Sequence, residues 1–232
     1  MKTKSRLVLG ALVLLGPGLL GAAHHDPGGT GSSIDREAVA ASLSELGIDG
    51  ATRVDLLDRL EAGEVWDSLT GAHPIAVETE EIDGRLHVTR IYEDGSRSQT
   101  VTQLPRARPG MGISSATACT TPLGPYPYGW NFTNCRVDLN VALIRMNYYI
   151  DGRTRGNTSA YPPLVTRALN LDYQILGGSF VSESLTRPRP TGSLSLDAQA
   201  RGRVVLNYPA QGGTVTISLY ANVGSIIKAT NS

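Results

Sequence analysis

The sequence predicts a mainly β protein, in which a small N-terminal α+β region precedes an antiparallel β-sandwich or barrel with one disulfide. Three observations indicate this fold class. Several short stretches after residue 112 alternate apolar and polar residues with the period of two that a half-buried strand requires. Glycine and proline interrupt the chain between these stretches. The only two cysteines, Cys119 and Cys135, lie just before the clearest of them.

Residues 1–23 have the pattern of a secretory signal peptide. Three basic residues precede an apolar run from residue 7 to residue 20, and small residues follow it. The run is too short, and too often interrupted by glycine and proline, to span a bilayer. We therefore expect a secreted protein that is cleaved after Ala23 and keeps no membrane anchor. Residues 24–33 are polar and rich in glycine, which predicts a disordered leader.

Residues 34–104 are expected to form a helical hairpin followed by a polar three-stranded meander. Apolar residues recur at helical spacing after Asp35 and after Asp49, and a glycine ends each stretch. Two Asp-Gly pairs then mark tight turns between short strands, because glycine supplies the positive φ that such turns need. The meander has few bulky apolar residues. It therefore either packs against the helical pair through Trp66 and Leu69 or stays extended and mobile.

Residues 105–112 have the sequence PRARPGMG and are expected to be a linker between two domains. Residues 113–232 form the predicted antiparallel β domain with its disulfide. One face of each strand should enter the core of this domain. The clearest alternation places apolar residues at every second position in three groups: Ala142, Ile144, Met146, Tyr148 and Ile150; Leu169, Leu171, Tyr173 and Ile175; Val215, Ile217 and Leu219.

The two regions differ in charge. Residues 24–110 contain 16 acidic and 8 basic side chains, whereas residues 111–232 contain 5 acidic and 10 basic ones. Opposite charges of this size suggest two folding units that attract each other. The basic excess is too small to predict nucleic-acid binding. The arginines of the second region either contact an anionic wall polymer or the acidic region, or serve only to keep the surface soluble; they are Arg136, Arg145, Arg153, Arg155, Arg201 and Arg203.

Cys119 and Cys135 are expected to form a disulfide, because two cysteines in an exported chain are usually paired. Closing a loop of this length stabilises a fold by about 3 kcal/mol on the loop-entropy model. The spacing of the two cysteines, without histidine nearby, matches no known set of metal ligands. We therefore predict neither a metal site nor a cofactor.

The sequence resembles a group of uncharacterised secreted actinobacterial proteins. The resemblance rests on EAGEVWDSLTGAHPI at the end of the helical stretch, on EDGS at a turn of the meander, and on GWNFTNCRVDLN around the second cysteine. It extends over residues 36–232. It implies a secreted protein in two parts with a disulfide-stapled β domain, and it assigns no catalytic residue to this chain.

Catalysis by the common triads is not expected. No histidine follows residue 110, and the motifs of serine hydrolases, zinc peptidases and nucleotide-binding loops do not occur. Paired carboxylates are the remaining route to hydrolysis. Asp172 and Glu183 lie on neighbouring predicted strands, where they could face one another, but Asp172 falls on the polar side of its strand, where a solvated charge is expected. The acidic candidates in the β domain are Asp138, Asp151, Asp172, Glu183 and Asp197.

The predicted ligand-binding residues are Tyr126, Tyr128, Trp130 and Phe132, which fall at every second position. On an extended backbone these four rings point the same way. Flat rings displayed on one face suit stacking on sugar rings or packing on a protein partner. The alternative is that the rings seal one end of the core beneath the disulfide.

The function that these observations favour is a secreted, non-catalytic binding module of the extracellular space or cell envelope. Its partner would be a glycan, a cell-wall polymer or a protein surface. Two alternatives of other kinds remain. One is a carboxylate-dependent secreted hydrolase, and the other is a self-associating structural surface protein.

Overall fold

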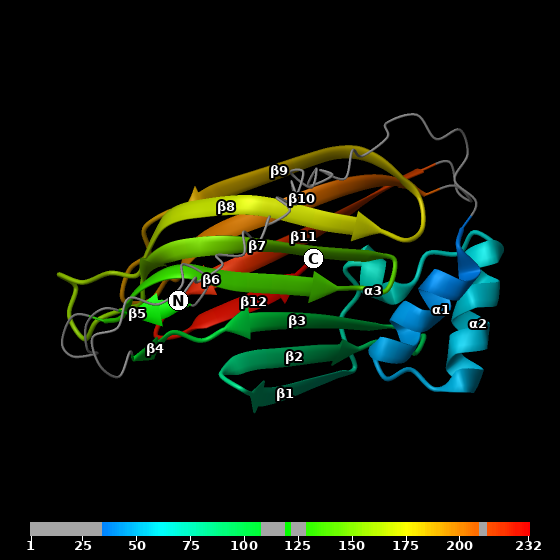
Figure 1. Ribbon diagram of the computed structural model, residues 1–232, viewed down its shortest axis with the longest axis horizontal. Helices are drawn as coiled ribbons and strands as arrows, with labels where there is room; N and C mark the ends of the chain where they lie inside the picture. The colour runs from blue at the N-terminus through cyan, green and yellow to red at the C-terminus, as the bar shows by residue number, and fades with distance from the viewer. Residues whose placement is uncertain (1–33, 108–118, 122–128, 209–212) are drawn as a thin grey trace, which may run out of the picture. The chain divides into compact units, whose positions relative to one another are not determined.

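The computed structural model describes residues 34–107, 119–121, 129–208 and 213–232. All of them belong to one compact unit, Gly31–Ser232, which contains two sheets and three short helices (Figure 1). The fold class agrees with the prediction: mainly β, with two antiparallel sheets, one disulfide and a small helical region near the N-terminus. The predicted signal peptide and leader lie outside the described residues. None of the described helices has the length and apolar character needed to cross a membrane.

Two helices and a single helical turn precede the first sheet. The carboxylate of Asp35 caps the first helix by accepting a hydrogen bond from the backbone N–H of Ala38 at 3.0 Å. Asp49 caps the second helix through the N–H of Thr52 at 2.9 Å. The helices are α1 (Arg36–Glu45), α2 (Gly50–Glu61) and α3 (Asp67–Thr70).

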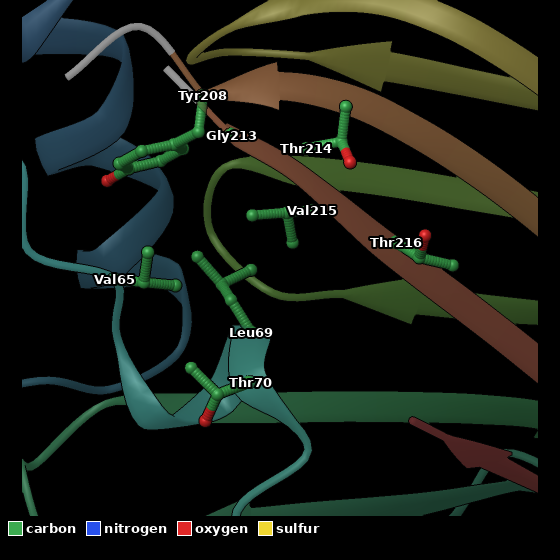
Figure 2. Close-up of a pocket in the computed structure, with 8 residues that line it drawn as sticks. All are labelled: Val65, Leu69, Thr70, Tyr208, Gly213, Thr214, Val215 and Thr216. Atoms are coloured by element: carbon green, nitrogen blue, oxygen red, sulfur yellow. The ribbon is translucent and has the colours of Figure 1, made fainter. Parts of the chain in front are cut away.

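Trp66 and Leu69 pack the helical region together and against a sheet. Trp66 is fully buried, and its indole N–H donates to the backbone oxygen of Leu56 in α2 at 2.9 Å. Leu69 of α3 is also buried and points toward Val215 in β11 (Gly213–Val223), as Figure 2 shows. Both side chains are therefore buried, but Leu69 points toward a strand of the second sheet, whereas the sequence analysis expected it to pack the meander against the helical pair.

The first sheet has eight strands. Strands β1, β2, β3 and β6 follow one another, β7 and β8 continue on the other side of β6, and the short β5 and β4 lie beside the beginning of β6. All pairs are antiparallel except the two-residue pair β4–β5. The strands are β1 (Ala76–Ile82), β2 (Arg85–Ile91), β3 (Arg97–Gln103), β4 (Arg106–Ala107), β5 (Thr120–Thr121), β6 (Asn131–Asn140), β7 (Ile144–Arg153) and β8 (Leu164–Ile175).

The meander and the β domain share this sheet. Strand β3, the last of the meander, pairs with β6 from Gln99 opposite Asn140 to Thr102 opposite Val137. The predicted linker, 105–112, therefore connects strands of one sheet, and most of it lies outside the described residues. Backbone pairing with β6 supplies the partner that the polar meander needs.

The second sheet has four strands in the order β12-β11-β10-β9, all antiparallel. Its strands are β9 (Ser179–Arg189), β10 (Ala198–Tyr208), β11 (Gly213–Val223) and β12 (Ile227–Asn231). In β10 and β11 the buried residues alternate with outward-facing ones, so each strand presents one side to the core and one to solvent.

Buried hydroxyl groups join β3 of the first sheet to β12 of the second. Ser98, Thr100 and Thr102 are almost fully buried, although a core normally holds apolar side chains at such positions. The hydroxyl of Thr100 donates to the backbone oxygen of Ala229 at 3.2 Å, and the hydroxyl of Thr102 accepts from the N–H of Ala229 at 3.1 Å. The polar composition of β3 therefore satisfies backbone groups on the edge of β12.

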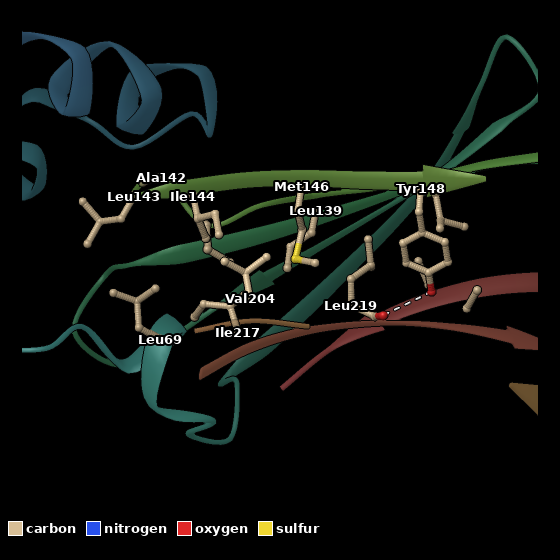
Figure 3. Close-up of a cluster of buried hydrophobic side chains, with 14 of the residues drawn as sticks. Leu69, Leu139, Ala142, Leu143, Ile144, Met146, Tyr148, Val204, Ile217 and Leu219 are labelled. Atoms are coloured by element: carbon tan, nitrogen blue, oxygen red, sulfur yellow. Dashed lines mark hydrogen bonds between the residues drawn. The ribbon is translucent and has the colours of Figure 1, made fainter. Parts of the chain in front are cut away.

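Apolar side chains from both sheets fill the space between them (Figure 3). Leu139 and Met146 from the first sheet meet Ile217 and Leu219 from the second. Tyr148 is fully buried among them, and its hydroxyl lies 3.1 Å from the backbone oxygen of Leu219, to which it donates. Burial raises the pKa of Tyr148, so its phenol stays neutral and serves as a hydrogen-bond donor inside the core.

Candidate binding surface

The disulfide between Cys119 and Cys135 is formed, and it lies at the end of the first sheet where β5 meets β6. Phe132, near the start of β6, is 1% exposed. A Cβ added to Gly152 of β7 would lie only 2.9 Å from the Phe132 ring, so the ring packs closely on the backbone of the neighbouring strand. Phe132 therefore belongs to the core, as the alternative interpretation of this loop proposed.

Trp130 is half-buried, and hydrogen bonds hold its backbone in place. Its N–H donates to the hydroxyl of Thr154 at 2.8 Å, and its carbonyl accepts from the N–H of Thr154 at 2.9 Å. Gly129 has a φ of +74° and lies so close to Thr154 that a Cβ would be 2.2 Å from its carbonyl oxygen. Tyr126 and Tyr128 lie outside the described residues. The two predicted rings that the structure describes therefore differ in exposure.

The expected pair of carboxylates, Asp172 and Glu183, is not formed. Asp172 accepts a hydrogen bond from the side-chain amide of Asn147 at 3.4 Å on the outward side of the first sheet. Glu183 lies opposite the buried Val204 and hydrogen-bonds the hydroxyl of Tyr173. The sequence could not reveal this, because the two residues belong to strands of different sheets.

Each of the other predicted carboxylates has an arginine partner. Asp151 is buried and pairs with Arg167 at 2.6 Å, and Asp197 pairs with Arg155 at 2.7 Å. Asp138 pairs with Arg136, which lies on the same strand, β6, at 2.6 Å. Burial nevertheless raises the pKa of Asp138, because desolvation outweighs that attraction. Within the described ranges, no three His, Cys, Asp or Glu side chains gather in a way that could hold a metal ion.

A pocket of about 390 Å³ lies between the helical region and the end of the second sheet (Figure 2). Among the described residues that line it, the polar side-chain atoms are hydroxyls. That of Tyr208 donates to the backbone oxygen of Glu64 at 3.4 Å, and burial raises the pKa of this phenol to about 12. The described residues that line this pocket contribute no charged side chain and no histidine that could act as a general base. The residues that line it are Val65, Leu69, Thr70, Tyr208, Gly213, Thr214, Val215 and Thr216.

The outward side of the first sheet carries charges of both signs that neutralise one another. Arg136 pairs with Asp138, and Arg145 pairs with Glu45 of α1 at 2.5 Å. A shallow depression of about 140 Å³ lies around Asp138. This side is therefore polar but has no strong net charge.

The outward side of the second sheet is different, because its charged side chains are all basic. The four strands contain one carboxylate, Glu183, and the register places it opposite Val204, on the core side. We call the outward side the cationic face. Cross-strand pairing arranges it in three rows: Ser184, Arg203 and Ser218; Thr186, Arg201, Tyr220 and Thr230; Arg189, Gln199, Asn222 and Lys228.

Hydrogen bonds and ring contacts order this face. The amide of Gln199 donates to Asn222 at 2.9 Å, and the amide of Asn222 donates to Thr230 at 3.1 Å. The guanidinium of Arg201 lies over the ring of Tyr220, 6.0 Å from its centre. In the part of the chain that the structure describes, no carboxylate forms an ion pair with the four cations of this face, which are Arg189, Arg201, Arg203 and Lys228.

Sequence reasoning named Arg201 and Arg203 among six arginines that could contact an anionic wall polymer, but it did not identify the cationic face. Arg201 and Arg203 alternate with buried residues, so the pattern alone could predict that they lie on the outward side of β10. Tyr220 and Lys228 come from later strands, and only the pairing register brings them beside these arginines. The signal was therefore present for one strand and absent for the face as a whole.

The fold and this face define a mainly β protein of two packed antiparallel sheets with one disulfide and one strongly basic sheet surface. No family model, curated protein or solved structure matches this chain. The resemblance to secreted actinobacterial proteins therefore stays a prediction.

Proposed function

We propose that this protein is a secreted, non-catalytic binding module that holds an extended ligand on the cationic face. The observation that carries the proposal is the register of β9–β12, which lines up donors and acceptors in three parallel rows on one sheet surface. A row of this kind suits a ligand with many hydroxyl groups, because amides and hydroxyls both donate and accept hydrogen bonds.

The export part of the proposal is supported by two independent features. The first 23 residues have the charge and apolar pattern of a signal peptide. The disulfide between Cys119 and Cys135 is the kind of bond that persists in oxidising compartments outside the cytosol. Both agree with a role in the extracellular space or cell envelope.

The test is a binding screen of residues 24–232 against soluble glycans and purified cell-wall fractions, with a variant on the face beside a control. Tyr220→Ala removes the ring beneath Arg201, whereas Tyr149→Ala removes a half-buried tyrosine from the first sheet. We expect at least one ligand to bind. Tyr220→Ala should weaken its binding by about tenfold, because the ring holds the Arg201 guanidinium in place, and Tyr149→Ala should retain it. Equal weakening by both variants, or no binding to any probe, would contradict the proposal.

Hydrolysis is a second candidate, favoured by one observation. Asp138 and Asp172 lie in one cross-strand row on the first sheet with Asn147 between them. Two strand spacings separate their backbones by about 10 Å. The carboxyl groups of inverting glycosidases are about 6.5–9.5 Å apart, and the acid among them needs a raised pKa, as Asp138 has. Release of reducing sugar by the wild type and its loss in Asp138→Asn and Asp172→Asn alike would favour this candidate.

A further inference from the structure

The cationic face concentrates positive charge without neutralising it. Arg201 and Arg203 are two residues apart on β10, which places them about 7 Å from one another along the strand. At this separation, charges repel one another even at physiological ionic strength, where the screening length is about 8 Å. A ligand that brings negative charge to the face relieves this repulsion. The same feature raises the rate at which an anion encounters the surface.

The contacts of the four cations leave them able to bind an anion. Arg203 is exposed, and its hydrogen bond to the hydroxyl of Thr216, the side-chain partner found among the described residues, is long at 3.4 Å. Lys228 is exposed on β12. Arg189 donates to the backbone oxygen of Asp197 at 2.8 Å, which uses one of its five N–H groups. Arg189, Arg203 and Lys228 therefore each have donors left for a sulfate, phosphate or carboxylate group.

The groups between the cations favour a glycan over a lipid surface. The rows contain hydroxyl and amide side chains, which match the hydroxyl groups of a sugar. Val205 points outward from β10 but is only 8% exposed. Ile226 is 43% exposed, but it lies in the bend before β12, two residues from Lys228, so exposed apolar surface borders the rows at their end and does not separate the cations. Proteins that lie on membranes place exposed apolar side chains in the interface beside their basic ones.

The same groups argue against nucleic acid as the preferred ligand. Proteins that bind single strands offer exposed aromatic rings on which bases stack. The only aromatic ring in the three rows is that of Tyr220, which is half-buried and has the guanidinium of Arg201 above it. A base would therefore find no open ring on this face.

We propose that the ligand of the cationic face is an anionic polysaccharide, whose acidic groups pair with Arg189, Arg201, Arg203 and Lys228. This inference rests on the proposed function, since it names the class of ligand that the binding module holds. The sugar hydroxyls contact the amide and hydroxyl side chains between the cations. Binding weakens as salt rises, because exposed charge pairs are screened.

The experiment measures binding of residues 24–232 to dextran sulfate and to uncharged dextran, which share one sugar backbone. An oligodeoxythymidylate and phosphatidylglycerol vesicles serve as the anionic probes of other classes. The test variant is Arg203→Gln/Lys228→Gln. The control, Arg53→Gln/Arg85→Gln, removes the same net charge from α2 and β2, away from the face.

We expect the chain to bind dextran sulfate, the test variant to weaken binding by about tenfold, and the control to change it by less than about twofold. Raising sodium chloride from about 0.05 M to about 0.5 M should weaken the wild type further. A charge-preserving variant, Arg203→Lys/Lys228→Arg, should bind nearly as well as the wild type. This variant keeps both positive charges, so binding near the wild-type level would show that the test variant weakens binding through the loss of charge.

Four results would overturn the inference. Equal binding to dextran would show that charge does not select the ligand, and the proposed function would then stand with a neutral glycan. Tighter binding to the oligonucleotide or to the vesicles would replace the glycan by another class of partner. Unchanged binding by the test variant would place the site elsewhere. No binding to dextran sulfate would exclude this ligand class. If no glycan or cell-wall fraction bound either, the proposed function would be wrong as well.

Discussion

The hydroxyl of Thr100 in β3 donates a hydrogen bond of 3.2 Å to the backbone oxygen of Ala229 in β12. This bond, with its neighbour from the N–H of Ala229 to Thr102, links the two sheets along one side through side chains, where no backbone ladder joins them. Both threonines are 1% exposed or less. A buried polar group that loses its partner costs about 1–3 kcal/mol, so these hydroxyls matter for stability.

Replacing both hydroxyls by methyl groups tests this link. The double variant Thr100→Val/Thr102→Val keeps the shape of the side chains and leaves the N–H and the carbonyl of Ala229 without these partners. We expect the free energy of unfolding, measured by urea titration, to fall by about 2–4 kcal/mol. Thr79→Val on the exposed strand β1 is the control and should change it by less than about 0.5 kcal/mol. A double variant as stable as the wild type would mean that the hydrogen bonds of these two threonines contribute nothing to the free energy of unfolding.

The disulfide should stabilise the fold by restricting the unfolded chain. Cys119 and Cys135 are 16 residues apart in sequence. Removing the bond with Cys119→Ser/Cys135→Ser is expected to lower the free energy of unfolding by about 3 kcal/mol. Reductant should lower the melting temperature of the wild type toward that of the variant and leave the variant unchanged. If reductant left the melting temperature of the wild type unchanged, the disulfide would not stabilise the fold.

Phe132 and Trp130 should respond differently to truncation, although both fall in one alternating aromatic run. Phe132→Ala removes a ring that is 1% exposed and should cost about 3–5 kcal/mol of unfolding free energy. Trp130 is half-buried, so Trp130→Ala should cost less. Chemical denaturation of the two variants side by side measures the difference. An equal loss of unfolding free energy in both variants would show that Trp130 is a core residue. A loss of ligand binding in Trp130→Ala alone would support its predicted binding role.

Tyr173 should ionise at unusually high pH. Burial and the hydrogen bond to the carboxylate of Glu183 raise the pKa of this phenol to about 12, because a negative charge nearby opposes ionisation. The ordinary value is 10.0. The unfolded chain therefore loses this proton more readily than the folded one, and the neutral phenol contributes stability that is lost as pH rises from about 10 toward about 12.

Glu183→Gln should lower the pKa of Tyr173 by removing that charge, although the effect of burial remains. The measurement is the phenolate absorbance near 295 nm, taken as the difference between each protein and the same protein carrying Tyr173→Phe, so that the other tyrosines cancel. An unchanged pKa in Glu183→Gln would show that burial and the charge of Asp172 are responsible.

The local pattern predicts much of the architecture because it reflects geometry that neighbouring residues impose on one another. Asp83-Gly84 and Asp94-Gly95 turn the chain where expected, and Asp83, Gly84 and Gly95 all have positive φ. The alternating residues Ile144, Met146, Tyr148 and Ile150 are all buried. Alternation does not tell which of two aromatic residues with the same period enters the core, so the pattern alone cannot separate the buried Phe132 from the half-buried Trp130.

By itself, the sequence determined that this is a mainly β chain with a helical beginning, one disulfide and strands whose apolar sides face inward, because these features depend on residues close together along the backbone or on a count of cysteines. Only the tertiary structure decided that β3 pairs with β6, that hydroxyls close the seam at β12, and that Arg201, Arg203, Tyr220 and Lys228 share one face. The physical reason is that strand pairing between distant segments is selected by the packing of the whole core, and a register shift of one residue would turn each of these side chains to the opposite side.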